Sequence, residues 1–388
     1  MNGGEDNRRP ASTGYYESIM KELLKHLIQS APILKNGELR VGEVLADFFD
    51  RNGIEASLDH WDLTRANVTA SIGRKDENAP TLLFGAHLDV VPAAKERWQT
   101  DPFCPVEMEG RIIGRGAVDM LGGLCSAAAT MVDLSKQPLN GRVIFAATAG
   151  EETDSCGVKR FIEQFQSRIK NPLGVIITEP TGMKILRAHR GILWLKVQTF
   201  GKTAHGSTPQ AGINAVLKMN ALLNRLQDWK IPHTPHPLLG GCSMSINRIT
   251  GGSATNIVPD NCSVEIDIRT LPGQDHTVII DDLQNLCDDL QKNDPDFKTQ
   301  ISIIRTVDAL ETPAEKPFVK AVCQATGITE TQAAGFTTDG PYFEKLNAPV
   351  LIFGPGDGSL CHKPDEYIEI DALEQARQMY NRIVRQIL

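Results

Sequence analysis

A chain of 388 residues is longer than one hydrophobic core usually supports, so two folding units are expected. A hydrophobic share of 41% and a charged share of 23% exclude fibrous, collagenous and wholly disordered proteins. The net charge of −8 comes without long runs of one sign, so neither a nucleic acid nor a membrane surface is an expected partner.

The first part of the chain predicts a cytoplasmic protein that begins with helices. Its start lacks the apolar core of a secretion signal, and no stretch of about 18 apolar residues occurs anywhere. The eight cysteines include no Cys-x-x-Cys pair, so we expect them to be reduced. The spacing of apolar residues then predicts helices over 16–27 and 41–52.

Four short, nearly continuous apolar runs follow the helices. They are rich in Val, Ile and Leu, are separated by helix-like segments, and lie at 81–85, 143–147, 175–177 and 350–353. Such runs are typical of strands buried on both faces of an α/β sheet. We therefore predict a catalytic α/β domain with a central, mostly parallel sheet.

The segment between the third and fourth runs has a different rhythm. It predicts strands and helices in the order β-α-β-β-α-β, at 191–200, 211–229, 242–250, 261–270, 276–292 and 299–305. This order is that of a ferredoxin-like α+β domain. We predict that residues 1–187 and 306–388 form the catalytic domain and that residues 188–305 are inserted into it.

Polar clusters follow the four apolar runs: HLD, AGEE, TEP and GPGDGSLCH. In open α/β sheets, ligands gather at the carboxyl ends of the strands. The candidate site residues are His87, Asp89, Asp119 of GRGAVDMLGG, Glu151, Glu152, Glu179 and His362. Imidazole with carboxylate suits Zn, and also Co or Mn. Two divalent cations are expected because one would leave much of the negative charge uncompensated.

The spacing of these residues suggests their roles. Residues i and i+2 at a strand end face the same way, so Asp89 is expected to accept the second ring N–H of His87. Adjacent Glu151 and Glu152 point differently, so one is expected to bind metal and the other to act as general base. Asp119 lies in a glycine-rich loop and is the candidate bridge between the two cations.

The ordered motifs resemble those of the dinuclear zinc aminoacylase family. HLDVVP, GRGAVDM, TAGEE, EPT and GPG before HKPDEY carry the resemblance, which extends from 80 to the C-terminus. That family includes acetylornithine deacetylase, succinyl-diaminopimelate desuccinylase and glutamate-type carboxypeptidases. The resemblance implies that one metal is held by His87, Glu179 and bridging Asp119, and the other by His362, Glu152 and Asp119. It further implies that Glu151 is the base and Asp89 the orienting carboxylate.

The same resemblance implies that the inserted domain is a lid and dimerisation domain. In GKTAHGSTPQAG, it assigns His205 to the active site of the partner subunit in a homodimer, where it would stabilise the oxyanion. GGSATNIVPD and DIRTLPG imply that Asn256 and Arg269 contact the substrate and its carboxylate. The planar fork of arginine matches a carboxylate, although a structural ion pair is the alternative for Arg269.

The implied function is hydrolysis of the amide bond of a small N-acyl amino acid. Acetylornithine deacetylase is the first expectation, although FTTDG near Asp339 is closer to the desuccinylase form. A glutamate-type carboxypeptidase or dipeptidase is a more distant alternative. Two other classes are a catalytically silent binding relative, which would lack a ligand or the base, and a single-metal hydrolase, which would bind about one metal per chain.

Overall fold

The structure is a computed structural model that describes residues 11–31 and 37–388. The chain divides into two compact units. The larger unit comprises the described residues up to Arg187 with Thr312–Gln332 and Thr338–Leu388, and the smaller unit comprises Ala188–Glu311 and Ala333–Thr337. Relative to the expected insert, 188–305, the smaller unit also takes in 306–311 and 333–337, and the last strand of its sheet runs on to Val307.

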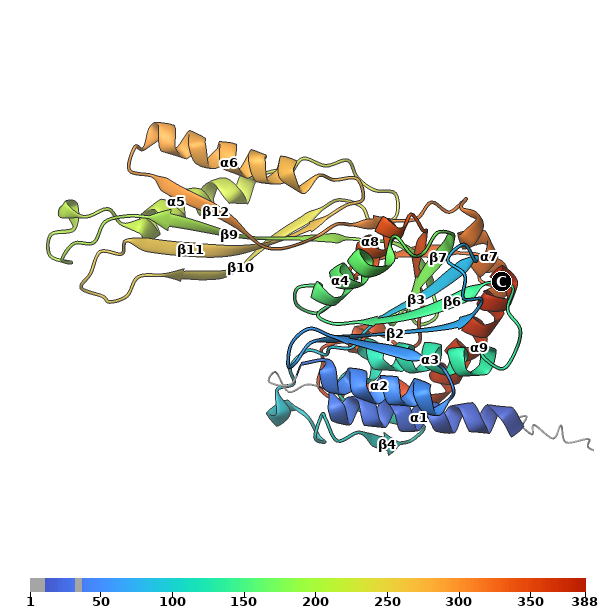
Figure 1. Cartoon of the computed structure of the whole chain (residues 1–388). Helices are drawn as coiled ribbons and strands as arrows, with labels where there is room; N and C mark the ends of the chain where they lie inside the picture. Colours follow the sequence, from blue (N-terminus) through green and yellow to red (C-terminus); the bar gives the residue numbers. More distant parts are fainter. Residues whose placement is uncertain (1–10, 32–36) are drawn as a thin grey trace, which may run out of the picture. The chain divides into compact units, whose positions relative to one another are not determined.

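The larger unit is built around a sheet with helices on both faces (Figure 1). Its first elements are α1 (Ala11–Ser30), α2 (Leu39–Arg51), β1 (Ala56–His60), β2 (Ala66–Gly73), β3 (Thr81–His87), η1 (Lys95–Arg97), β4 (Val106–Met108), β5 (Arg111–Ile113), η2 (Ala117–Leu121) and α3 (Gly122–Leu134). They are followed by β6 (Arg142–Thr148), α4 (Cys156–Phe165), β7 (Pro172–Ile177) and β8 (Ile185–His189). After the smaller unit come α7 (Pro317–Thr326), β14 (Thr331–Ala334), α8 (Gly340–Phe343), η4 (Glu344–Leu346), β15 (Val350–Ile352), η5 (Gly358–Leu360), β16 (Tyr367–Glu369) and α9 (Ile370–Ile387).

The large sheet has a parallel centre and antiparallel edges. Its strand order is β1-β2-β6-β3-β7-β15-β8-β13, with β14 pairing β8, where β13 is Leu310–Glu311. The four predicted strands are β3, β6, β7 and β15, and they pair with one another in parallel. The prediction of a parallel core is therefore confirmed, whereas antiparallel β2 and β8 beside it make the whole sheet mixed. Every residue of β3 and β15 is buried, as continuous apolar runs predict.

Helix α3 forms the centre of one layer beneath the sheet. Together with α1, α2 and α9 it covers one face, and α4 and α8 lie over the other (Figure 1). A side chain at Gly123 would place its Cβ only 1.9 Å from the Thr178 carbonyl oxygen, so glycine is required for this close approach. Within the described residues, Ala117–Leu134 is the one helical stretch long and apolar enough to cross a membrane, and 89% of it is buried as in a core helix.

The smaller unit is an antiparallel sheet with two helices covering one of its faces (Figure 1). Its elements are β9 (Gly191–Phe200), η3 (Pro209–Ala211), α5 (Ala215–Asp228), β10 (Ser243–Gly251), β11 (Asn261–Thr270), α6 (His276–Asn293) and β12 (Lys298–Val307). The antiparallel strand order is β10-β11-β9-β12, which confirms the predicted ferredoxin-like arrangement. Asn214 and Asp275 begin the two helices by accepting hydrogen bonds from backbone N–H groups of the first turn.

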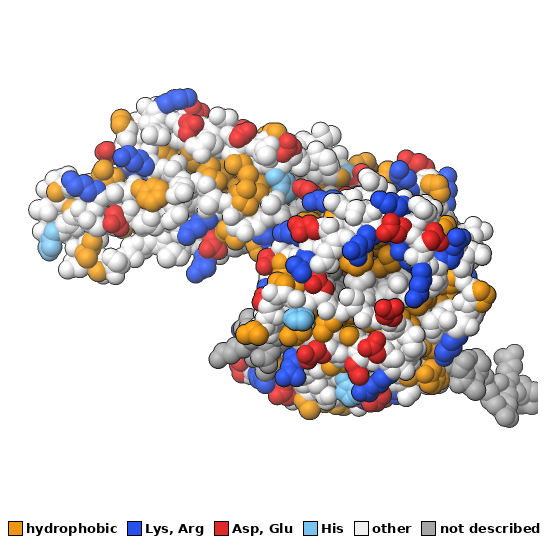
Figure 2. Space-filling view, viewed as in Figure 1, with side chains coloured by type: hydrophobic (Ala, Val, Ile, Leu, Met, Phe, Trp, Pro, Cys, Tyr) orange, Lys and Arg blue, Asp and Glu red, His pale blue; other side chains and the backbone are white. Residues whose placement is uncertain are grey.

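The surface carries both signs of charge. Figure 2 shows Lys and Arg side chains interspersed with Asp and Glu on the viewed face of each unit, and apolar side chains scattered among them. All eight cysteines are free, and Cys125, Cys262 and Cys287 are buried in the two cores as small hydrophobic side chains.

Strand β8 continues from the larger unit into the smaller one at Ala188, and its last residue, His189, is a buried titratable group. The residue is fully buried, and its ring N–H at Nδ1 donates to the Arg190 carbonyl oxygen, 2.8 Å away. Burial disfavours the imidazolium and lowers the pKa of His189 to about 4. The folded state therefore prefers the neutral ring, and its contribution to stability is complete above the unfolded pKa and is lost as the pH falls towards the folded one.

We expect His189→Asn to remove this part of the acid sensitivity. Between about pH 7.5 and about pH 5, the free energy of unfolding of the natural protein should fall by about 2 kcal/mol more than that of the variant. Urea unfolding of the metal-free natural protein and of the metal-free variant across this range measures this difference in the free energy of unfolding. The contributions of the other titrating groups are common to both proteins and cancel. Parallel pH profiles would show that folding does not lower the pKa of His189.

Candidate metal centre

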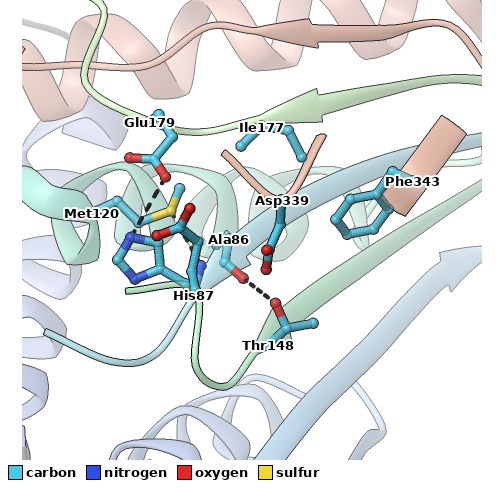
Figure 3. Close-up of a pocket in the computed structure, with 9 residues that line it drawn as sticks. Ala86, His87, Met120, Thr148, Ile177, Glu179, Asp339 and Phe343 are labelled. Carbon is cyan, nitrogen blue, oxygen red and sulfur yellow. Dashed lines mark hydrogen bonds and ion pairs between the residues drawn. The ribbon is translucent and has the colours of Figure 1, made fainter. Parts of the chain in front are cut away.

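The central strands end at a common edge of the sheet, and the predicted side chains lie there. β3 ends at His87, and Glu179 comes two residues after the end of β7. Because β3, β6 and β7 are parallel neighbours, their carboxyl ends meet. Figure 3 shows His87 and Glu179 directed toward one another from these two strand ends. The loop after β6 contributes Glu151 and Glu152.

Two groups of three side chains meet at Asp119. His87 Nε2 lies 3.3 Å from Asp119 Oδ1 and 3.5 Å from Glu179 Oε1. His362 Nε2 lies 3.2 Å from Asp119 Oδ2 and 3.0 Å from Glu152 Oε1. Within each group, the possible ligand atoms lie within 4.8 Å of one another. The two carboxylate oxygens of Asp119 thus face different histidines, as a bridging ligand requires.

Asp89 contacts both His87 and the loop after β6. The Nδ1–H of His87 is 2.9 Å from the backbone carbonyl oxygen of Asp89, while the carboxylate oxygen Oδ1 is farther away, at 3.6 Å. The carboxylate accepts hydrogen bonds from the backbone N–H groups of Glu151, at 3.1 Å, and Glu152, at 2.9 Å. The expected hydrogen bond to the ring is therefore made by the main chain of Asp89, and its side chain holds the Glu151–Glu152 turn.

The histidines lie in a strongly negative field. Burial opposes the charged form of His87, but the carboxylates of Glu179, Asp119 and Asp89 outweigh it and raise its pKa well above the usual value. Hydrogen bonds to Asp119 and Glu152 raise the pKa of His362 to about 10. The same two histidines lower the pKa of Asp119, against the effect of its burial. Positive charge is thus favoured at the position of each imidazole.

In the buried glutamates, the charged form is disfavoured. Burial raises the pKa of Glu151 well above its usual value, and the neighbouring carboxylate of Asp339 raises it further. Burial likewise raises the pKa of Glu179, although His87 lowers it. These shifts reflect several carboxylates gathered in a space where too few cationic groups are present to balance them.

A water-sized pocket lies beside the first group of three. Glu151, Glu179 and His87 line it together with Asp339 and apolar residues that include Phe343 (Figure 3). Asp339 is 4% exposed and comes from the turn before α8. In the sequence, Asp339 separates family branches, and no pattern there predicts that it lies in this pocket. An acidic residue just before a short helix gives no signal that would separate it from a helix cap.

The predicted oxyanion residue His205 and the predicted substrate contact Asn256 lie side by side in the smaller unit. The backbone N–H of Gly206, next to His205, donates to the Asn256 carbonyl oxygen at 2.8 Å, and His205 forms a β-bridge with Ile257. The ring of His205 is exposed, and its Nδ1 lies 2.7 Å from the Ser207 hydroxyl. The loops of His205 and Asn256 therefore form one surface.

Arg269 is engaged in an ion pair. Its Nε lies 2.9 Å from Asp267 Oδ1 and its Nη2 lies 3.0 Å from Oδ2, so both arms of the guanidinium face one carboxylate. The two residues are two positions apart on β11 and point to the same side of the sheet. The structure therefore shows the ion pair considered as the alternative for Arg269. A substrate carboxylate would have to compete with Asp267.

The donor set of the two groups fits two divalent cations. Each group offers one imidazole nitrogen and carboxylate oxygens, a combination that suits Zn, Co and Mn. Two dications would also neutralise carboxylates that are buried without enough positive charge. The residues that would hold them are His87, Asp119 and Glu179 for one cation and Asp119, Glu152 and His362 for the other.

The sequence matches the model of peptidase family M20/M25/M40 over residues 83–386. The chain belongs to this family. It is accordingly a hydrolase of the M20 metallo-amidohydrolase group, and the resemblance identified from its motifs is confirmed.

The chain is similar to other proteins over most of its length. A probable succinyl-diaminopimelate desuccinylase of Staphylococcus aureus strain MSSA476 is 31% identical over 379 residues, which cover 87% of this chain and 89% of that protein. An acetylornithine deacetylase of Pectobacterium carotovorum subsp. carotovorum strain PC1 is 31% identical over 336 residues, which cover 83% of each chain. An M20 family metallo-carboxypeptidase from Sulfolobus solfataricus has a similar structure, with a TM-score of 0.78 at 20% identity, covering 95% of this chain and 98% of that one. The last similarity confirms the predicted metallopeptidase fold.

Proposed function

We propose that this enzyme hydrolyses the amide bond of a small N-acyl amino acid, giving a carboxylic acid and a free amine. The observation that carries the proposal is the pair of ligand groups that share Asp119 beside buried Glu151. The relatives named deacetylase and desuccinylase support an acyl amino acid as the substrate. A catalytically silent relative would be expected to lack a ligand or the base, and none of the predicted ones is missing.

The proposed chemistry assigns distinct tasks to the side chains. Two bound divalent cations, for which Zn is the first choice, would polarise the amide carbonyl and acidify a water molecule. Glu151 would accept the proton of the attacking water and deliver it to the leaving nitrogen. Asp89 holds the backbone N–H groups of Glu151 and Glu152 and thereby keeps the base in place beside the neighbouring ligand.

The smaller unit has a second task in this proposal. We assign to His205, acting in a homodimer, the stabilisation of negative charge on the carbonyl oxygen, and to Asn256 and Arg269 contacts with the substrate. Exposed His205 next to the Asn256 loop supports this assignment, since neither is buried in the core of its own unit. We place the working enzyme in the cytoplasm.

His205→Ala is expected to lower kcat by about 100- to 1,000-fold, the usual effect of losing one oxyanion donor. Metal content should not change, because His205 belongs to neither ligand group. Steady-state kinetics and metal analysis of the same preparations test this, with His233→Ala as the control because His233 is another histidine of the smaller unit. Unchanged turnover in His205→Ala would remove the histidine from the mechanism.

N-acetylornithine is the first proposed substrate and N-succinyl-diaminopimelate the second. The motifs favour the deacetylase branch, whereas Asp339 in FTTDG and the similarity to the S. aureus desuccinylase favour the other. The deciding measurement is amine release from both compounds, from other N-acyl amino acids and from dipeptides, using metal-loaded and chelated enzyme. Preference for an N-acyl amino acid, lost on chelation, would support the proposal. Preference for dipeptides would overturn it, and about one metal per chain at full activity would favour a single-metal mechanism.

A further inference from the structure

Glu366 is a buried carboxylate near the metal centre that has no role in the chemistry described above. It follows His362 by four residues, in HKPDEY, and its side chain is fully buried. It belongs to neither group of metal ligands. A carboxylate is rarely buried completely unless it is paired and hydrogen-bonded, so the contacts of Glu366 indicate its role.

The carboxylate of Glu366 contacts the chain around Asp119 at several points. Its Oε1 accepts hydrogen bonds from the backbone N–H groups of Val118, at 2.9 Å, and Asp119, at 3.1 Å. Its Oε2 accepts a hydrogen bond from the Arg115 guanidinium. Its backbone carbonyl oxygen accepts from the Gly114 N–H at 2.9 Å. One residue therefore binds both ends of the segment 114–119, which carries the shared ligand.

Arg115 is itself held from other sides. Its side chain is 3% exposed, the guanidinium lies 5.2 Å from the centre of the Trp98 ring, and the backbone N–H donates to the Pro102 carbonyl oxygen. Next to it, Gly116 has a φ of 84°, and a Cβ there would lie 2.5 Å from a methyl carbon of Val90. The segment can therefore take this path only with glycine at position 116.

The segment that carries His362 also needs support. His362 has a φ of 65° and Asp365 a φ of 55°, conformations that cost free energy in residues other than glycine. The Asp365 carboxylate accepts from the Gln99 N–H at 2.9 Å, and Tyr367 pairs with Ile113 across β16 and β5. Glu366 lies between these two anchors and connects the segment directly to the Asp119 loop.

We propose that Glu366, supported by Arg115, is a positioning residue that sets the separation of Asp119 and His362. It thereby determines the affinity of the cation site that these two ligands form with Glu152. The inference rests on the proposed two-cation function. A positioning role differs from a general stabilising role. It requires that removing Glu366 lowers metal affinity by more than the accompanying loss of folding stability explains.

The test compares Glu366→Gln with a matched control, Glu374→Gln. Glu374 is also a buried carboxylate of the larger unit, paired with Arg377 at 2.6 Å and 2.7 Å, but its contacts lie on α9. Both variants thus lose one charge from a buried carboxylate–arginine pair. Zinc dissociation constants are measured by chelator competition for the natural protein and both variants, and thermal unfolding is measured on the metal-free proteins.

We expect Glu366→Gln to weaken zinc binding at the site of Asp119, Glu152 and His362 by about 10- to 100-fold, the usual effect of losing a partner that orients a ligand. Glu374→Gln should leave both dissociation constants unchanged, whatever it does to the unfolding temperature. If Glu366→Gln does not fold, Glu366→Asp replaces it, since the shorter side chain keeps the charge but cannot reach both backbone N–H groups. Weaker zinc binding in the folded variant supports the inference.

Two results would overturn it. The first is unchanged zinc affinity in the folded Glu366 variant while the natural protein binds two zinc ions, which would leave the proposed function intact. The second is an equal loss in Glu374→Gln, which would make the effect one of general stability. A natural protein that binds fewer than two zinc ions would instead overturn the proposed two-cation mechanism together with the inference.

Discussion

Replacing Glu151 by Gln is expected to lower kcat by about 100- to 10,000-fold, the range that a general base contributes. Gln has nearly the same size, but it cannot accept a proton from water. Glu151 is 8% exposed and belongs to neither group of metal ligands, so both cations should stay bound. Steady-state kinetics with N-acetylornithine and metal analysis of the same sample measure the two quantities.

The adjacent residue provides the control. Glu152 faces His362 at 3.0 Å and is a ligand candidate, so Glu152→Gln should reduce metal content as well as turnover. Added zinc should restore part of the activity of Glu152→Gln and none of that of Glu151→Gln. If the two variants lose metal equally, or if Glu151→Gln turns over normally, the assignment of base and ligand to these neighbours is wrong.

The parallel centre of the sheet and the position of the metal ligands could be predicted because both depend on local patterns. A strand buried on both faces needs a continuous apolar run, and β3, β6, β7 and β15 have one. Parallel strands bring their carboxyl ends to one edge, so polar residues placed after them converge even when they are far apart in the sequence. The assignment of individual ligands to two cations came from the family resemblance, because spacing left the roles of Glu151 and Glu152 open.

The antiparallel edges of the sheet could not be predicted in this way. β1 and β8 are short, and β1 has only partly buried and exposed residues, so their pairing depends on the sheet already present. Three contacts of the site have a similar origin. The His87 ring is bound by the carbonyl of Asp89, Asp339 reaches the pocket from a distant turn, and Glu366 binds backbone N–H groups. The contacts of His87 and Glu366 involve main-chain atoms, which do not depend on a partner's side chain and therefore leave no pattern in the sequence, and Asp339 is brought to the pocket by the tertiary fold alone.

Asp119→Asn is expected to weaken the binding of both cations. The decrease in affinity should exceed the roughly 100-fold decrease that can follow when a residue that only orients a ligand is removed. Its two oxygens face His87 and His362 separately, and the amide nitrogen of Asn cannot replace one of them as a ligand. His362→Asn is the matched comparison because His362 belongs to one group only, so it should release one cation and retain the other. Metal analysis after dialysis against a weak chelator, with activity measured on the same samples, distinguishes the two patterns. Loss of a single cation from Asp119→Asn would show that Asp119 serves one metal, and the proposed shared ligand would then have to be another carboxylate of the centre.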